Sequence, residues 1–103
     1  MSMTESELRT LRRAVAVYGP RRQAIKALEE LGELTQALCK WLGGDDPDTE
    51  RALWHVSEEI ADVEIMLAQL RIMMGSDNDV NAWTMLKISR LKDRLDAAEA
   101  MPP

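Results

Sequence analysis

Residues 50–74 read ERALWHVSEEIADVEIMLAQLRIMM, and apolar side chains recur around nearly the whole circumference of a helix over this stretch. A polar strip that contains Glu59 and Asp62 interrupts this pattern. At about 100° per residue, Met66 and Met73 project from the same side of the helix as these two acids. The segment therefore predicts a helix that is buried on most of its sides and that sets two carboxylates among apolar neighbours.

The sequence around this segment predicts three further helices. Glycines at 19, at 43–44 and at 75 end the first, second and third helices. Asp48 or Thr49 is the expected cap of the third helix, and the link SDND separates the third helix from the fourth. The expected ranges are about Glu5–Val17, Arg21–Leu42, Glu50–Met74 and Val80–Ala98.

The composition is that of one helical domain. The chain has 103 residues, of which 46% are hydrophobic and 30% charged, a balance typical of a globular protein. Leu, Ala, Ile and Met carry the apolar content and aromatic residues make up only 4%, which favours helices over strands. We therefore expect an all-α fold in a single domain over residues 1–103, with its core at about 18–98.

Charge and hydropathy exclude several kinds of partner. The formal net charge of −5 argues against non-specific nucleic-acid binding, which needs a basic surface. The longest nearly uncharged stretch, Ile65–Met74, contains Gln69 and Arg71 and is too short to cross a bilayer, and no signal peptide is recognisable. The single cysteine, Cys39, excludes an intramolecular disulfide and is expected to be a small core residue. The expected location is the cytoplasm.

A second acidic pair, Glu30 and Glu33 in EELGE, lies on the predicted helix before residues 50–74. Residues three apart are neighbours on one helix face, so each pair presents two carboxylates side by side. Taken alone, this pair is a solvated face that points away from the main apolar stripe of its helix. Packed against Glu59 and Asp62, it would bring four oxygen ligands to one spot, which is a site for Mg²⁺ or Mn²⁺. The expected apolar stripe consists of Ala24, Leu28, Leu31, Thr35, Leu38 and Leu42.

Other chemistries fit these residues less well. A di-iron carboxylate bundle needs Glu-x-x-His on two helices, and this sequence contains none. Zinc sites need Cys or His ligands. The single histidine, His55, is interpreted as a structural group or a neighbour of the site, with a role as base or ligand as the alternative. A glycosidase needs two carboxylates and not four in this arrangement.

ExxE on one helix followed by ExxD on the next resembles the all-α nucleoside triphosphate pyrophosphatases. That superfamily includes MazG-like proteins, dimeric dUTPases, dCTP pyrophosphatases and phosphoribosyl-ATP pyrophosphohydrolase. The resemblance runs from about Tyr18 to Leu95 and rests on YGPRRQAIKALEELGELTQAL, HVSEEIADVEIMLAQL and KISRLKDRL. It implies a four-helix MazG-like unit that assembles into a dimeric or tetrameric helical bundle, with sites completed at the interface.

The resemblance also implies a reaction and assigns roles to residues. The reaction is Mg²⁺-dependent hydrolysis of the α–β phosphoanhydride of (d)NTPs to a monophosphate and pyrophosphate, with Mn²⁺ as the other candidate ion and nucleotide-pool cleansing as the expected role. A carboxylate of the acidic cluster would accept the proton of the attacking water. The acids beside the ligands, Glu29 and Glu58, would orient a ligand or a water molecule. The implied metal ligands are Glu30, Glu33, Glu59 and Asp62, and the implied catalytic set is these four with Lys87.

The implied substrate contacts lie on three of the predicted helices. Trp41 and Trp54 flank the acidic motifs, and each either stacks on a nucleobase or packs in the core. Arg90 and Arg94 either extend a basic strip from Lys87 or form a solvated charged face. The residues expected to contact substrate are Lys26, Trp41, Trp54, Lys87, Arg90 and Arg94.

Two rival interpretations share these features. Phosphoribosyl-ATP pyrophosphohydrolase has the same acidic motifs, but the tyrosine-histidine that typically follows its second motif is absent here, where Glu64-Ile65-Met66 follows Val63. A non-catalytic helical dimerisation module would use its acids only for solvation and would respond neither to divalent ions nor to nucleotides. The apolar content of residues 50–74 and 80–98 exceeds what one copy can cover, so we expect a homo-oligomer.

Overall fold

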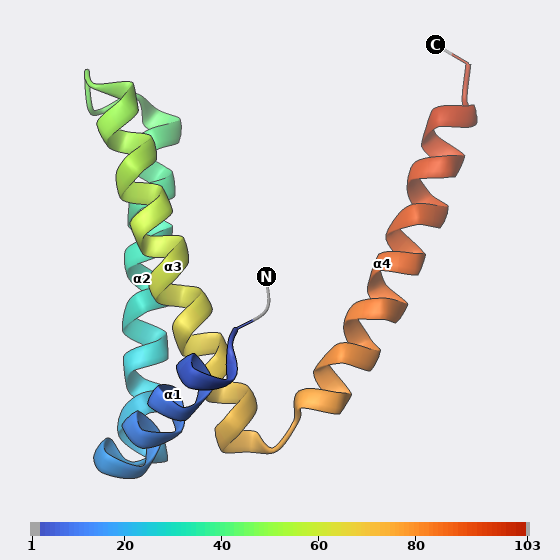
Figure 1. Cartoon of the computed structure of the whole chain (residues 1–103). Coiled ribbons are helices and arrows are strands. Elements are labelled where there is room, and N and C mark those ends of the chain that lie inside the picture. The colour runs from blue at the N-terminus through green and yellow to red at the C-terminus, as the bar shows by residue number, and fades with distance from the viewer. Residues whose placement is uncertain (1–2, 103) are drawn as a thin grey trace.

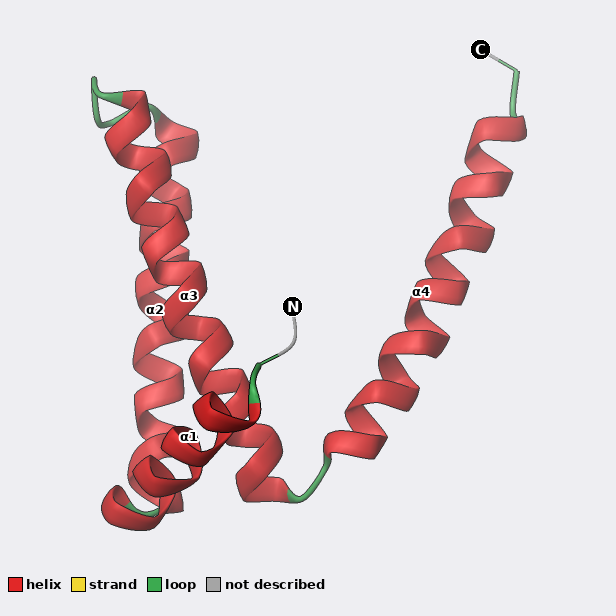
Figure 2. Ribbon diagram, viewed as in Figure 1, coloured by secondary structure: helices red, strands yellow, loops and turns green. Residues whose placement is uncertain are grey.

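A computed structural model describes residues 3–102 of the chain. These residues form four helices, and no strand is present among them (Figures 1 and 2). The predicted all-α fold with four helices is confirmed. Within the same range, no helix is both long and apolar enough to span a bilayer. The helices are α1 (Glu5–Tyr18), α2 (Pro20–Gly43), α3 (Thr49–Met74) and α4 (Asp77–Ala100).

Capping groups define the ends of the first three helices. At the start of α1, Thr4 Oγ1 accepts the backbone N–H of Glu7 at 3.1 Å, and the Glu7 carboxylate accepts the backbone N–H of Thr4 at 2.8 Å. Asp48 accepts the backbone N–H of Arg51 at 3.0 Å and is therefore the cap of α3. After α2 and α3, two glycines have φ of 66° and 59°, a left-handed conformation that glycine adopts without strain.

The fourth helix begins three residues earlier than the predicted Val80, because part of the link SDND is helical. Arg71 near the end of α3 donates to Asp77 Oδ1 at 2.9 Å and to Asn81 Oδ1 at 2.8 Å. These contacts tie the first turn of α4 to the last turn of α3. Asp77 and Asp79 also place negative charge at the positive end of the α4 dipole, which favours helix at this point.

The core lies between α2 and α3, which pack side by side as an antiparallel hairpin (Figure 1). Ala27 and Ala37 are buried on α2, and their small side chains allow the two helices to approach closely. α1 packs across one end of the hairpin, where it contacts both helices. The buried apolar side chains are Leu11 of α1, Ala27 and Ala37 of α2, and Val56, Val63 and Met66 of α3.

The fourth helix extends away from the hairpin and contacts α3 alone, next to the turn that joins them (Figure 1). All residues of α4 are described by the structure, and none of them is buried. The radius of gyration is 17.5 Å, whereas a compact domain of this length has about 13 Å. A single chain is therefore open, with one helix that lacks a packing partner over most of its length.

Three expectations about burial are wrong for the single chain. The predicted apolar stripe of α2 faces solvent, and Leu28 is 69% exposed, because α2 packs on α3 through its alanines and Glu30 instead. α3 is not buried on most of its sides, since Trp54 is 76% exposed and α4 does not fold back to cover it. Cys39 is exposed and is not a core residue.

Candidate metal centre

Four carboxylates from the two facing helices of the hairpin converge at one place. Glu30 and Glu33 come from α2, and Glu59 and Asp62 come from α3. Each of the four offers an oxygen, and these oxygens all lie within 4.8 Å of one another. The i, i+3 spacing puts the two acids of each helix on one face, and the antiparallel packing makes these two faces meet. The predicted juxtaposition of the four acids is present in the structure.

Two of these carboxylates are buried without full hydrogen bonding. Glu30 is 7% exposed and Glu59 is 5% exposed. Oε2 of each residue is buried and has no hydrogen-bond partner among residues 3–102. A buried polar atom without a partner costs about 1–3 kcal/mol, and more when the group is charged. The arrangement is therefore unfavourable unless a cation supplies the missing interaction.

The remaining two carboxylates form the more open side of the cluster. Glu33 is exposed and Asp62 is half-buried. The pKa of Glu33 is raised above its ordinary value, first by the negative charge of Glu30, then by desolvation and then by the charge of Glu59. The acids therefore repel one another, and a ligand can reach the cluster from the side of Glu33.

Lys26 is the cation that contacts the cluster within the chain. Its Nζ lies 3.2 Å from Glu30 Oε1, one helical turn before Glu30 on α2. The pKa of Lys26 is raised, mainly by its interaction with Glu30 and then by the charges of Glu29 and Glu33. One ammonium group that is half exposed to solvent cannot neutralise four carboxylates. Lys26 therefore lies beside the acidic cluster, and its contact with substrate stays a prediction.

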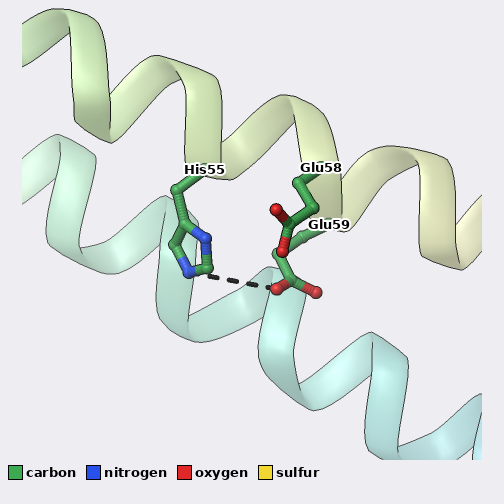
Figure 3. Close-up of side chains that lie close together, drawn as sticks. All are labelled: His55, Glu58 and Glu59. Carbon is green, nitrogen blue, oxygen red and sulfur yellow. Dashed lines mark ion pairs between the residues drawn. The ribbon is translucent and has the colours of Figure 1, made fainter.

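A histidine also lies near Glu59. His55 Nε2 is 3.9 Å from Glu59 Oε1, and the ring points from α3 toward that carboxylate (Figure 3). This distance exceeds that of a hydrogen bond. His55, Glu58 and Glu59 also offer three ligand atoms that lie within 4.8 Å of one another, so Glu59 belongs to two groups. His55, Glu58 and Glu29 are all exposed.

The two tryptophans expected near the substrate lie at the far end of the hairpin from α1. Trp54 is 76% exposed and lines a hollow of about 340 Å³ together with His55, Lys40 and Arg51. Trp41 is 40% exposed in the last turns of α2. Neither ring is buried in the core of the single chain. Their stacking on a nucleobase stays a prediction.

Three of the four cations expected to contact substrate lie on α4 and are exposed. Because α4 extends away from the hairpin, the structure does not bring Lys87, Arg90 or Arg94 to the acidic cluster of the same chain (Figure 1). Lys87 Nζ instead lies 5.9 Å from the centroid of the Trp83 ring.

The chemistry of the donor set fits a hard divalent cation. All four donors are carboxylate oxygens, which suit Mg²⁺, Mn²⁺ or Ca²⁺, whereas zinc and copper prefer nitrogen and sulfur. Oε2 of Glu30 and Oε2 of Glu59, which are buried and find no hydrogen-bond partner in the described range, are the atoms that such a cation would neutralise. The cluster can therefore hold a metal ion of this class.

One pair of site-supporting residues was not anticipated from the sequence. Gln23 Nε2 of α2 donates to Gln69 Oε1 of α3 at 2.8 Å, and both side chains are buried. Gln23 lies seven residues before Glu30, and Gln69 lies seven residues after Asp62. The heptad spacing puts each glutamine on the same helix face as its acid, two turns away. That spacing was the signal that could have revealed a polar pair that sets the register of α2 against α3.

In comparisons of the chain with models of protein families, with curated proteins and with solved structures, no match was found.

Proposed function

We propose that this protein is a Mg²⁺-dependent nucleoside triphosphate pyrophosphohydrolase, with Mn²⁺ as the other candidate ion. The observation that carries the proposal is the cluster of Glu30, Glu33, Glu59 and Asp62, in which two buried carboxylate oxygens lack a hydrogen-bond partner among residues 3–102. A site that concentrates negative charge on two facing helices suits a cation that in turn binds substrate phosphates. The ExxE and ExxD pattern, which resembles that of the all-α pyrophosphatases, favours this chemistry over other uses of a divalent ion.

The proposed reaction is hydrolysis at the α-phosphorus. The oxygen of a water molecule bonds to the α-phosphorus, the bond from that phosphorus to the bridging oxygen breaks, and pyrophosphate leaves. A divalent cation held by the four carboxylates would supply charge neutralisation on the phosphate oxygens and would lower the pKa of a water molecule. One carboxylate of the cluster accepts the proton that the water loses. Lys26, which already lies 3.2 Å from Glu30, stabilises negative charge on the substrate beside the cluster.

The proposal includes a homo-oligomer, and the exposed area of the chain supports it. The accessible surface is 8234 Å², whereas a compact protein of this mass exposes about 5,800 Å². The excess of about 2,400 Å² per chain, or about 4,800 Å² for two copies, lies within the range of about 2,000–5,000 Å² that obligate homodimers bury. Much of it is apolar, since Trp83, Leu91 and Leu95 of α4 are 56%, 46% and 50% exposed. α4 is therefore the element that we expect a second copy to cover.

The distribution of charge on α4 supports the same assembly. At about 100° per residue, Lys87, Arg90 and Arg94 fall within about 60° of one another, beside the side of the helix that carries Leu91 and Leu95. Docking of that side onto a second hairpin would bring three cations toward a strongly acidic surface. In this arrangement Lys87 and the arginines of one copy contact the phosphates bound at the acidic cluster of the other copy.

A non-catalytic dimerisation module is the alternative from another class. The exposed apolar surface of α2, α3 and α4 is consistent with association of any kind. In such a module, two buried carboxylate oxygens that find no hydrogen-bond partner in the described part of the chain would only lower the stability. Phosphoribosyl-ATP pyrophosphohydrolase is the alternative within the enzyme class, and it uses the same cluster on a different substrate.

The test is release of pyrophosphate from a panel of NTPs, dNTPs, modified nucleotides and phosphoribosyl-ATP, with Mg²⁺, Mn²⁺ or EDTA. Metal-dependent formation of monophosphate and pyrophosphate is expected, and Glu59→Gln should abolish it without loss of helix by circular dichroism. Glu64→Gln is the matched control, because Glu64 is an exposed acid of the same helix outside the cluster. Turnover that survives in E59Q would refute the assignment of the catalytic site to the acidic cluster. Absence of pyrophosphate release from every nucleotide in the panel would favour the dimerisation module.

A further inference from the structure

A hollow of about 720 Å³ lies at the corner where α1 meets α2. Arg21, Arg22 and Lys26 line it with a single acid, Glu29, although the protein as a whole carries a net charge of −5. Tyr18 contributes an aromatic ring that is 54% exposed. Its volume is in the ordinary range of small-molecule sites. The excess of cationic side chains suits an anionic ligand.

The hollow adjoins the acidic cluster through Lys26. Lys26 lines the hollow, and its Nζ also contacts Glu30 of the cluster at 3.2 Å. Arg22, Lys26 and Glu30 are four residues apart on α2, which places them at steps of about 6 Å along the helix axis. Around that axis Arg22 and Lys26 lie within about 40° of Glu33, which is the exposed acid of the cluster. A single extended ligand on this side of α2 can therefore reach both the cluster and the hollow.

Arg22 is held in place for such a ligand. Its guanidinium lies 5.2 Å from the centroid of the Tyr18 ring, a cation–π contact that restricts the side chain but leaves its N–H groups free to donate. Among residues 3–102, neither Arg21 nor Arg22 forms an ion pair with a carboxylate. A guanidinium binds phosphate through two parallel hydrogen bonds. The first turn of α2 also contains no acid, so the positive end of its dipole adds to the potential of the arginines.

We propose that this hollow is the subsite for the phosphate groups of the substrate that lie farthest from the acidic cluster, and that Arg22 there selects triphosphates over diphosphates. The inference rests on the proposed function, because it assigns the hollow to the substrate of the same cluster. Lys26 contacts the phosphate chain between the two places. Arg22 acts on binding of the terminal phosphate and takes no part in the bond that breaks.

Binding of inorganic tripolyphosphate tests the subsite without turnover. Isothermal titration calorimetry with Mg²⁺ in excess over the anion compares the wild type, Arg22→Gln and Arg9→Gln, since Arg9 is exposed on α1 and does not line the hollow. Loss of a charge-assisted bidentate contact should weaken binding about tenfold or more in R22Q, and R9Q should stay within about twofold. Amide shifts in the NMR spectrum of the labelled protein should move at residues 18–26. Equal affinities for the two variants would overturn the proposal.

Turnover of NTPs and NDPs separates this inference from the proposed function. In R22Q, kcat/KM for NTPs should fall about tenfold while kcat/KM for NDPs is unchanged, and Arg22→Lys should recover part of the loss. If the wild type turns over NTPs but R22Q behaves like R9Q, the subsite is wrong and the proposed function stands. If no nucleotide is hydrolysed but tripolyphosphate binds and R22Q weakens it, the anion subsite stands and the proposed function fails.

Discussion

Replacement of Glu59 by Gln should make the metal-free protein more stable. Glu59 is 5% exposed, and its Oε2 lacks a hydrogen-bond partner within residues 3–102 while three other carboxylates lie nearby. The amide removes one buried negative charge, and its NH₂ group can donate to the acids that the carboxylate repels. Relief of one such group is worth about 1–3 kcal/mol. For a chain of 103 residues, that corresponds to a rise in Tm of about 5–14 °C.

The same substitution should remove stabilisation by metal. Wild-type protein with Mg²⁺ at 100 times its Kd gains about 2.7 kcal/mol. E59Q loses one ligand and should gain little. Scanning calorimetry in EDTA and in Mg²⁺, at one protein concentration, should therefore show E59Q above the wild type without metal and a large metal-dependent rise in Tm for the wild type alone.

The control is Glu64→Gln, which makes the same change in charge on the exposed side of α3. E64Q should differ little from the wild type in EDTA and should keep its full response to Mg²⁺. The reasoning is refuted if E59Q is no more stable than E64Q without metal. It is also refuted if Mg²⁺ leaves the Tm of the wild type unchanged, since the buried oxygens Oε2 of Glu30 and Oε2 of Glu59 would then not bind the cation.

Three further perturbations test other parts of the structure. Arg51 and the backbone N–H of Asp48 lower the pKa of Asp46 from 3.8 to about 2. The stability that this carboxylate contributes is therefore complete above pH 4 and is lost as pH falls toward 2. Asp46→Asn should have a lower Tm than the wild type at pH 7, and a difference in Tm that does not narrow in acid would contradict this cause. Leu91→Asp on α4 should convert the oligomer to monomer in sedimentation experiments, and an unchanged mass would place the interface elsewhere. Gln69→Leu should lower the free energy of unfolding in urea by about 1–3 kcal/mol, because it leaves the Gln23 amide without its hydrogen-bond partner. The double variant Gln23→Leu with Gln69→Leu should lose less stability than either single variant. Additive losses of stability would show that the two side chains are not coupled.

The positions of the helices could be predicted because their signals are local. Caps, glycines and the apolar period act within a few residues, so the predicted end of α3 is confirmed, and Asp48 is the cap out of the two expected candidates, Asp48 and Thr49. α4 begins three residues before the predicted Val80 for two reasons. Asp77 and Asp79 are a local signal for a helix start, and Arg71 of the preceding helix stabilises the first turn through a contact that the link sequence alone does not reveal. The pairing of two acids on each helix was likewise a local property, since residues at i and i+3 share a face.

The faces that meet between helices were decided by tertiary packing. The apolar period of α2 favours its leucine-rich stripe as the core face, but the face with Ala27, Ala37 and Gln23 packs on α3 and buries Glu30 with it. Propensity and periodicity describe each helix by itself, whereas close packing depends on the shapes of two surfaces and on pairs such as Gln23 with Gln69.

The sequence by itself determined four helices and two carboxylate pairs, because hydrogen bonds within a helix and helix caps depend on nearby residues. Only the tertiary structure decided that the two pairs face each other and that α4 with its cations extends away from the hairpin. It also decided that one oxygen of Glu30 and one of Glu59 are buried with no hydrogen-bond partner within residues 3–102. The physical reason is that these properties depend on how separate helices share solvent-excluded space, which is a relation between surfaces and not a property of any one segment.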